Sequence, residues 1–222
     1  MNIWAVIPVK PLLEGKSRLS HLLTAEERAD LTRRFLTNLL QELEQVRGIQ
    51  RRLVISRDPA VLKIARRYGA STYEETDGHE LNSSLTRASH LAAAQRADCL
   101  LVLPADLPLA TAEDVRMMIR GALPAAGNGN GAGYYYQKRA LTICPDHLED
   151  GTNALLICPP SGFPFRYGPD SFRLHLEEAE RLGMDRRIIH APGLKFDLDT
   201  EADLEIYRTL RQERSSASVG DR

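Results

Sequence analysis

The sequence predicts an α/β fold, with a mostly parallel central sheet and helices on both of its faces. Short apolar runs alternate with amphipathic runs through the first half of the chain, and capping residues mark where several amphipathic runs begin. The length of 222 residues lies within the range of one α/β domain. We therefore expect one domain over residues 1–212 and a disordered tail over 213–222.

The elements of the first half follow from apolar runs and helix-start signals. Thr24 with Glu27 forms a capping box, and Asp58 before Pro59 is typical of a helix N-terminus. Thr111 caps a later helix. The predicted strands are 2–9, 52–56, 71–74 and 99–103, and the predicted helices are 24–46, 58–68, 81–96 and the helix that follows Thr111.

The second half is less regular. Residues 121–133 are rich in Gly, Ala and Asn, a composition that does not pack, so we predict a flexible insertion there. Thr200 with Asp203 caps the last helix. The remaining predicted elements are strands at 135–143, 154–158, 187–190 and 195–198 and a helix at 170–182.

Charge and composition exclude several classes of protein. Lys and Arg number 29 against 30 Asp and Glu, so no overall field favours nucleic acid or a membrane surface as a partner. The apolar opening meets Pro8 and Lys10 too early for a signal peptide, so we expect a cytoplasmic protein. Cys99, Cys144 and Cys158 lie far apart in apolar runs, which favours buried reduced thiols over a disulfide or a zinc site.

In a doubly wound sheet, ligands bind beyond the carboxyl ends of the strands, so we expect the functional residues in the loops that follow strands. The loop after the first strand carries three cations, Lys10, Lys16 and Arg18, which suit a polyphosphate. Gly15-Lys16-Ser17 imitates a P-loop, but Lys10 stands where that motif needs glycine, and nearby prolines restrict the backbone. A solvated surface loop is the alternative interpretation.

Acidic side chains follow two later strands. Asp106 lies between prolines after the most apolar run of the chain, and strand periodicity places Asp197 and Asp199 on one face. Mg²⁺ is commonly bound by a few carboxylates together with phosphate oxygens, so these three residues are the predicted metal ligands. The alternatives are a turn aspartate for Asp106 and an aspartate assisting the last helix for Asp199.

Two small polar segments, 151–154 and 167–172, are candidates for anion binding through backbone amides, and the second opens a helix. Both compositions are also common in turns and caps. The six histidines, His175 among them, form no cluster in the sequence, so we predict no histidine catalyst.

Together these segments resemble the guanylyltransferases of coenzyme F420 biosynthesis, which activate 2-phospho-L-lactate, phosphoenolpyruvate or 3-phospho-D-glycerate. Relatives that load CMP onto sugar acids share a similar opening and the Asp-Thr pair before the last helix. The resemblance is carried by 7–11 with 16–19, by 81–85, 103–108 and 151–156, by 167–172 with His175, and by 192–194 with 197–200.

The resemblance implies a single-domain Rossmann-like nucleotidyltransferase fold of the GT-A-like type, with GTP as the donor and Mg²⁺ as cofactor. It implies that Thr152, Gly168 and Ser171 bind the carboxylate and phosphate of the acid, and that Asn82 lies near the nucleoside. The predicted nucleotide contacts are Pro8, Lys10, Asn82, Ser83, Pro104 and Asp106, and the predicted catalytic cations are Lys10, Lys16 and Arg18.

The expected reaction moves GMP from GTP onto a small phosphorylated carboxylic acid for a downstream transferase. Because the chain has a bacterial style we favour phosphoenolpyruvate, with the other two acids as alternatives. Two alternatives of other classes are a P-loop-like kinase and a non-catalytic GTP-binding module. The oligomeric state stays open, and a homodimer is the commonest assembly among soluble proteins.

Overall fold

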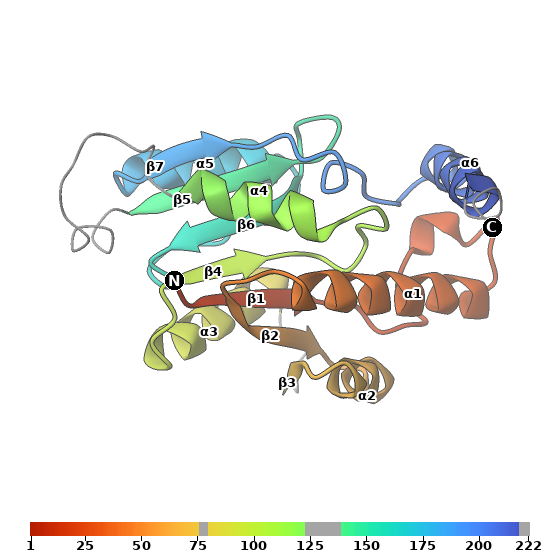
Figure 1. The fold of residues 1–222 in the computed structure, drawn as a ribbon, viewed down its shortest axis with the longest axis horizontal. Helices are drawn as coiled ribbons and strands as arrows, with labels where there is room; N and C mark the ends of the chain where they lie inside the picture. The colour runs from red at the N-terminus through yellow and green to blue at the C-terminus, as the bar shows by residue number, and fades with distance from the viewer. Residues whose placement is uncertain (76–79, 123–138, 218–222) are drawn as a thin grey trace.

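The computed structural model describes residues 1–75, 80–122 and 139–217, with side chains up to residue 212. Within these residues, seven strands form one sheet in the order β3-β2-β1-β4-β6-β5-β7 (Figure 1). The strands are β1 Ile3–Pro8, β2 Ile49–Ser56, β3 Ser71–Glu74, β4 Cys99–Val102, β5 Ala140–Pro145, β6 Thr152–Cys158 and β7 Asp185–Ile188. The helices are α1 Ala25–Glu44, α2 Pro59–Arg67, α3 Leu81–Ala94, α4 Ala112–Ala122, α5 Ser171–Arg181 and α6 Glu201–Ala217, with a short 3₁₀ turn at Ser17–Leu19.

The sheet is mostly parallel, as predicted. β1 pairs in parallel with β2 and β4, β2 with β3, and β5 with β7. β6 is antiparallel to both of its neighbours, β4 and β5. The sequence pattern did not indicate this reversed strand, because a strand buried on both faces has the same apolar composition in either direction.

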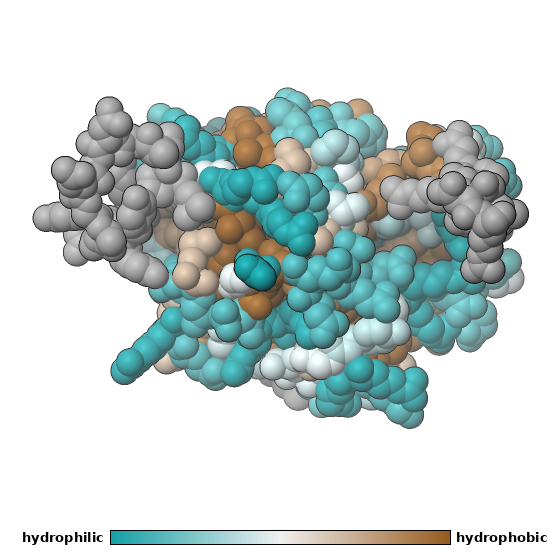
Figure 2. Space-filling model, in the orientation of Figure 1, coloured by the Kyte–Doolittle hydropathy of each residue, from teal (hydrophilic) through white to brown (hydrophobic). Residues whose placement is uncertain are grey.

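Helices cover both faces of the sheet, which confirms the predicted α/β architecture. The first core joins one side of β1, with Ile3, Ala5 and Ile7, to α1, α2 and α4. The second core joins the opposite side of β1, with Trp4 and Val6, to α3 and α5. In Figure 2, the outer surface over α1 and α4 is mainly hydrophilic and is interrupted by small apolar areas. No helix of the described residues is long and apolar enough to span a membrane.

Several predicted helix starts are confirmed in detail. The Thr24 hydroxyl accepts the amide of Glu27, whose carboxylate accepts the amide of Thr24, so both halves of the capping box are present. Asp58 caps α2 with Pro59 as the first helical residue. Thr200 and Asp203 form the equivalent pair at the start of α6.

The carboxyl-terminal part of the chain differs from the prediction. α6 continues to Ala217, beyond residue 213 where we placed the start of a tail, while residues 218–222 lie outside the described part. Its first turns pack Leu204 and Tyr207 against Phe35 of α1. Most of the predicted insertion at 121–133 also lies outside the described residues, because α4 ends at Ala122 and the next described residue is 139.

The strand predicted at 195–198 is absent, because this segment pairs with no neighbouring strand. Leu198 makes one backbone bond, from its amide to the carbonyl oxygen of Asp106. The expected alternation of buried and exposed side chains is present although the segment pairs with no strand. Leu198 is buried, whereas Asp197 and Asp199 are partly exposed.

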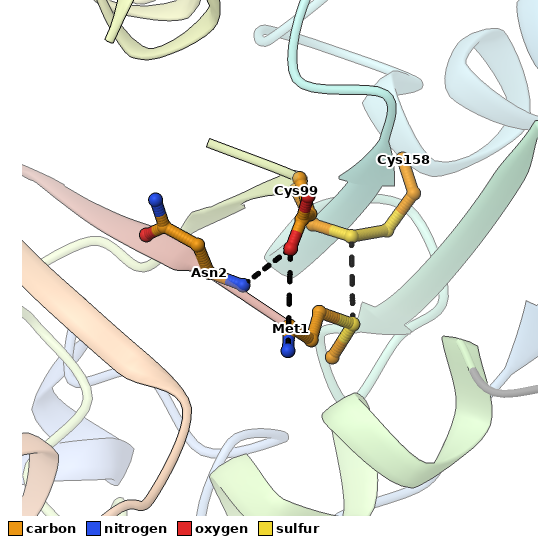
Figure 3. The surroundings of a disulfide bond; sticks show 5 residues. Met1, Asn2, Cys99 and Cys158 are labelled. Carbon is orange, nitrogen blue, oxygen red and sulfur yellow. Dashed lines mark hydrogen bonds and ion pairs between the residues drawn. A yellow bond between two sulfur atoms is a disulfide. The ribbon is translucent and has the colours of Figure 1, made fainter. Parts of the chain in front are cut away.

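The prediction for the cysteines is wrong for two of them, because Cys99 and Cys158 form a disulfide (Figure 3). Leu100 of β4 pairs with Ile157 of antiparallel β6, so the next residues outward, Cys99 and Cys158, face each other with Cα atoms 4.4 Å apart. The sulfur of Met1 lies 3.8 Å from that of Cys99. Cys144 is a buried free thiol, as predicted.

Candidate active site

A cavity of about 570 Å³ opens at the end of the sheet where β1 and β4 finish. The order of the strands predicts a ligand site at this place. From β1 the chain turns to β2 on one side and later returns to β4 on the other, so the carboxyl ends of β1 and β4 flank a topological switch point. Because β6 runs in the opposite direction, its first residue, Thr152, reaches the same end. The lining includes Pro8, Lys10, Lys16, Pro104, Asp106, Thr152, Asn153, Tyr167, Gly168, Ser171, Asp197 and Asp199.

Lys16 is the central cation of this site. Its side chain is 6% exposed, and its Nζ lies 3.4 Å from Oδ2 of Asp106 and 3.3 Å from Oδ1 of Asp199. The loop that carries Lys16 is held at Leu12, whose amide donates to Asp58, the residue that also caps α2. One ammonium therefore joins carboxylates that are far apart in the chain.

The other two predicted cations are more exposed. Arg18 has a side chain that is 75% exposed and lies 3.7 Å from Asp199, so this ion pair is weakly held. Lys10 is exposed and lines the cavity mouth. The loop is not a P-loop: Lys16 has a left-handed backbone with φ of 55°, and only a three-residue 3₁₀ turn follows it.

Asp106, Asp197 and Asp199 all line the cavity, and their role as metal ligands stays a prediction. Burial raises the pKa of Asp197, and the negative charges of Asp106 and Asp199 raise it further. Carboxylates that repel one another in a half-buried site fit a divalent cation, whose preferred ligands are oxygens. Within the described residues, however, no three His, Cys, Asp or Glu side chains form a ready-made metal cluster.

The segment that carries Asp197 and Asp199 is held by hydrogen bonds to two elements, α4 and β6. Asp114 of α4 accepts the amide of Gly193, and a Cβ atom added to Gly193 would lie 2.3 Å from the carbonyl oxygen of Leu109. Asn153 of β6 donates to the carbonyl oxygen of Leu194 at 2.9 Å and to Oδ1 of Asp197 at 3.4 Å. The Pro192-Gly193-Leu194 sequence thus has a physical role, since only glycine fits this close approach.

Thr152 and Ser171 also line the cavity, and their hydroxyl oxygens lie 3.3 Å apart. Behind them His175 is fully buried, and its Nδ1 lies 3.0 Å from the Thr152 hydroxyl. Our sequence interpretation gave His175 no role. The spacing of His175 from Ser171 could have indicated that the two side chains lie together, because residues four apart in a helix share a face.

The expectation that backbone amides around Thr152 and Ser171 are free to bind an anion is wrong for several of them. The amide of Gly151 donates to Asp146, that of Ser171 to the carbonyl of Gly168, and that of Phe172 to the carbonyl of Asp150. These amides close turns and fix the start of α5. Thr152 and Ser171 both line the cavity, and their hydroxyl groups are candidates to contact an anion there.

Asn82 and Ser83 lie outside the set of residues that line the cavity. Asn82 donates to the carbonyl oxygen of Tyr167 at 3.0 Å and accepts the amide of Tyr167 at 2.8 Å. Ser83 is exposed. Asn82 therefore fixes the loop that carries Gly168, and a contact of either residue with the nucleoside stays a prediction.

Two charged residues that line the cavity, Arg57 and Glu75, were not predicted from the sequence, because each follows a strand without a distinctive motif. Arg57, after β2, forms an ion pair with Glu14 of the first loop. Glu75, after β3, accepts a hydrogen bond from the buried Ser84 of α3. These contacts connect the mouth of the cavity to α3 and to the first loop.

Solved structures share this architecture at low sequence identity. A nucleotidyl transferase from Methanothermobacter has a TM-score of 0.62 and 13% identity, covering 95% of this chain and 99% of its own. A CMP:2-keto-3-deoxy-manno-octonic acid synthetase complexed with CTP has a TM-score of 0.57 and 16% identity, covering 96% and 100%. These similarities show that the chain has the fold of these nucleotidyltransferases.

The sequence comparisons are more specific. Residues 3–209 match the family described as guanylyl transferase CofC like. A protein of Rubrobacter xylanophilus named phosphoenolpyruvate guanylyltransferase is 41% identical over 204 residues, 92% of each chain. A protein of Sphaerobacter thermophilus with the same name is 35% identical over 205 residues, again 92% of each. The chain belongs to the CofC-like guanylyl transferase family and is an enzyme of the nucleotidyltransferase class.

Proposed function

We propose that this enzyme transfers GMP from GTP to phosphoenolpyruvate and releases pyrophosphate, as a step of coenzyme F420 biosynthesis. The choice of acceptor is supported by the name shared by the relatives at 41% and 35% identity. The observation that carries the proposal is that one cavity is lined by two chemically different groups of residues. Lys16, Asp106 and Asp199 form a charged group, while Thr152 and Ser171 form a hydroxyl pair.

The charged group suits the triphosphate and a divalent ion. Asp106, Asp197 and Asp199 are the residues that would hold Mg²⁺, because they are oxygen ligands gathered at the edge where phosphates would lie. When bound, Mg²⁺ neutralises phosphate charge and aligns the reacting groups. Pro8, Lys10 and Pro104 line the same cavity and are the proposed nucleotide contacts, with Asn82 and Ser83 near the nucleoside.

The hydroxyl pair suits the acid. Thr152, Gly168 and Ser171 are proposed to bind its carboxylate and phosphate. An oxygen of the acceptor phosphate forms a bond to the α-phosphorus of GTP, and the bond from that phosphorus to the bridging oxygen breaks, so that pyrophosphate departs with the electron pair. No protein nucleophile is needed, since the acceptor phosphate is already ionised at neutral pH and positioning dominates.

Lys10, Lys16 and Arg18 are the proposed catalytic cations. On nucleotide binding Lys16 exchanges carboxylate contacts for phosphate oxygens, and Lys10 and Arg18 approach from the exposed rim. They stabilise the charge that builds on the departing pyrophosphate, each contributing on the order of a few kcal/mol. We further propose that the protein acts in the cytoplasm, passes its product to a downstream transferase and forms a homodimer.

The decisive experiment incubates pure protein with GTP and Mg²⁺ and with each of the three acids separately, together with the transferase that accepts the activated intermediate. The expected result is pyrophosphate release with phosphoenolpyruvate and much less with 2-phospho-L-lactate or 3-phospho-D-glycerate. Turnover with only one of the other acids would replace the acceptor. GTP binding without pyrophosphate release under all three conditions would contradict the proposal and favour a non-catalytic module.

A further inference from the structure

The hydroxyls of Thr152 and Ser171 are backed by a buried histidine. The exposed fractions are 6% for Thr152, 2% for Ser171 and 0% for His175. Nδ1 of His175 lies 3.0 Å from Oγ1 of Thr152, which in turn lies 3.3 Å from Oγ of Ser171. The three side chains form a chain of hydrogen bonds that ends at the cavity.

The surroundings of His175 determine which ring nitrogen carries the proton. The amide of Arg166 donates to Nε2 at 2.9 Å, so Nε2 must be the unprotonated nitrogen. Burial among Phe163 and Tyr167 lowers the pKa of His175 to about 4, so the ring is neutral at neutral pH. A neutral ring with a bare Nε2 carries its single proton on Nδ1. His175 therefore donates to Thr152.

The direction of this bond decides what the hydroxyl pair offers to a ligand. With His175 as donor, Thr152 and Ser171 hold two protons and share one bond, so one proton is left to point into the cavity, from whichever hydroxyl does not donate to the other. With the opposite tautomer, Thr152 would donate to His175 and Ser171 to Thr152, and no proton would be left. The tautomer thus determines whether the pair presents a donor or only acceptors.

We propose that His175 is a positioning residue for the acid: through Thr152 it makes the Thr152–Ser171 pair a hydrogen-bond donor toward a negatively charged oxygen of the acceptor substrate. This inference rests on the proposed function, because it assigns the acid to this hydroxyl pair. An anionic acceptor pairs strongly with such a donor, whereas a pair that only accepts would repel it.

Two substitutions separate the two nitrogens of the ring. His175→Asn places an amide nitrogen near the position of Nδ1 and keeps the donor to Thr152. His175→Gln places its polar end near the position of Nε2, so it keeps the acceptor for Arg166 and loses the donor. We expect His175→Gln to raise KM for phosphoenolpyruvate by about tenfold or more with KM for GTP unchanged, and His175→Asn to retain most of the affinity.

Coupling to Thr152 distinguishes positioning from a general structural effect. Thr152→Val removes the hydroxyl at nearly constant shape, so His175→Gln added to Thr152→Val should cause no further rise in KM for the acid. His90→Gln, on the exposed face of α3, is the matched control. Equal losses in His175→Gln and His175→Asn, or full additivity with Thr152→Val, would overturn the inference.

A second measurement needs neither a variant nor turnover. In ¹⁵N NMR spectra of the wild-type enzyme at pH 7, we expect Nδ1 of His175 to be protonated and Nε2 to be unprotonated. A proton on Nε2 would overturn the inference even if the enzyme transfers GMP. If no acid supports turnover while this tautomer is observed, the proposed function fails and the tautomer assignment stands, and calorimetry with phosphoenolpyruvate then tests the binding role.

Discussion

Both polar atoms of the Asn82 side chain bond the backbone of a single residue, Tyr167, one at 3.0 Å and the other at 2.8 Å. This pair ties α3 to the loop that carries Gly168 and leads to Ser171. We expect Asn82→Ala to raise KM for the acid by about five- to tenfold, because the loop loses two hydrogen bonds worth about 1 kcal/mol each. Steady-state kinetics with each substrate varied separately measures this effect. An additional rise in KM for GTP would support the proposed place of Asn82 near the nucleoside, and an unchanged KM for the acid would contradict the role of the Asn82–Tyr167 bonds in holding this loop.

Lys16 should matter more than a surface lysine, because it neutralises Asp106 and Asp199 before any substrate binds. We expect Lys16→Ala to lower kcat/KM for GTP by about 10²- to 10³-fold, the range found when one donor that stabilises transition-state charge is removed. Lys63→Ala, at an exposed position of α2, is the control. A kcat/KM for Lys16→Ala within threefold of the wild-type value would show that the contacts seen here do not matter to the reaction.

His175 should make the stability of the protein depend on pH in acid. Its pKa falls from 6.5 to about 4 on folding, because of burial, with the nearby Glu178 acting in the opposite direction. The unfolded chain therefore takes up a proton as the pH falls below about 6.5, and the folded protein does not until about pH 4. The stabilisation from the neutral ring is complete above pH 6.5, and up to roughly 3 kcal/mol of it is lost by pH 4.

Urea unfolding of wild type and of His175→Asn across this pH range measures that effect, because other titrating groups cancel in the difference between the two proteins. The difference in the free energy of unfolding should shrink as the pH falls from 6.5 to 4. A constant difference over the range would contradict a buried neutral histidine.

The disulfide between Cys99 and Cys158 closes a separation of 59 residues across β4 and β6. We expect reduction to lower the free energy of unfolding by about 2–4 kcal/mol. Thermal melts with and without dithiothreitol test this, and the Cys99→Ala, Cys158→Ala double variant should not respond to the reductant. Thiol labelling of the unfolded, non-reduced protein should find one free cysteine, Cys144, and three labelled thiols would contradict the bond.

Local signals in the sequence predicted most of the architecture. The capping pairs Thr24–Glu27 and Thr200–Asp203 set helix starts through bonds within four residues, so they can be recognised without knowledge of the rest of the chain. The place of Asp106 at the cavity was also predictable, because it follows β4 and the loops after parallel strands meet at one end of such a sheet.

Features that depend on pairing between distant segments were not predictable. The reversed direction of β6 sets the facing of Cys99 and Cys158, and no local pattern encodes it. The segment around Asp197 was taken for a strand because its side chains alternate, although its backbone is held by Asn153 and by the carbonyl of Asp106. The proposed role of His175 depends on the bond from the amide of Arg166, which no helix or strand pattern in the sequence indicates.

The most direct test of the central claim is the rate of pyrophosphate release from GTP, with phosphoenolpyruvate and Mg²⁺, by the Asp106→Ala variant. If Asp106, Asp197 and Asp199 together hold the metal between the two substrates, the rate should fall by a factor of 10² or more, as expected for loss of a transition-state contact. Circular dichroism and the melting temperature should show an intact fold. A folded Asp106→Ala protein that keeps its rate within tenfold of wild type would contradict this arrangement of the site.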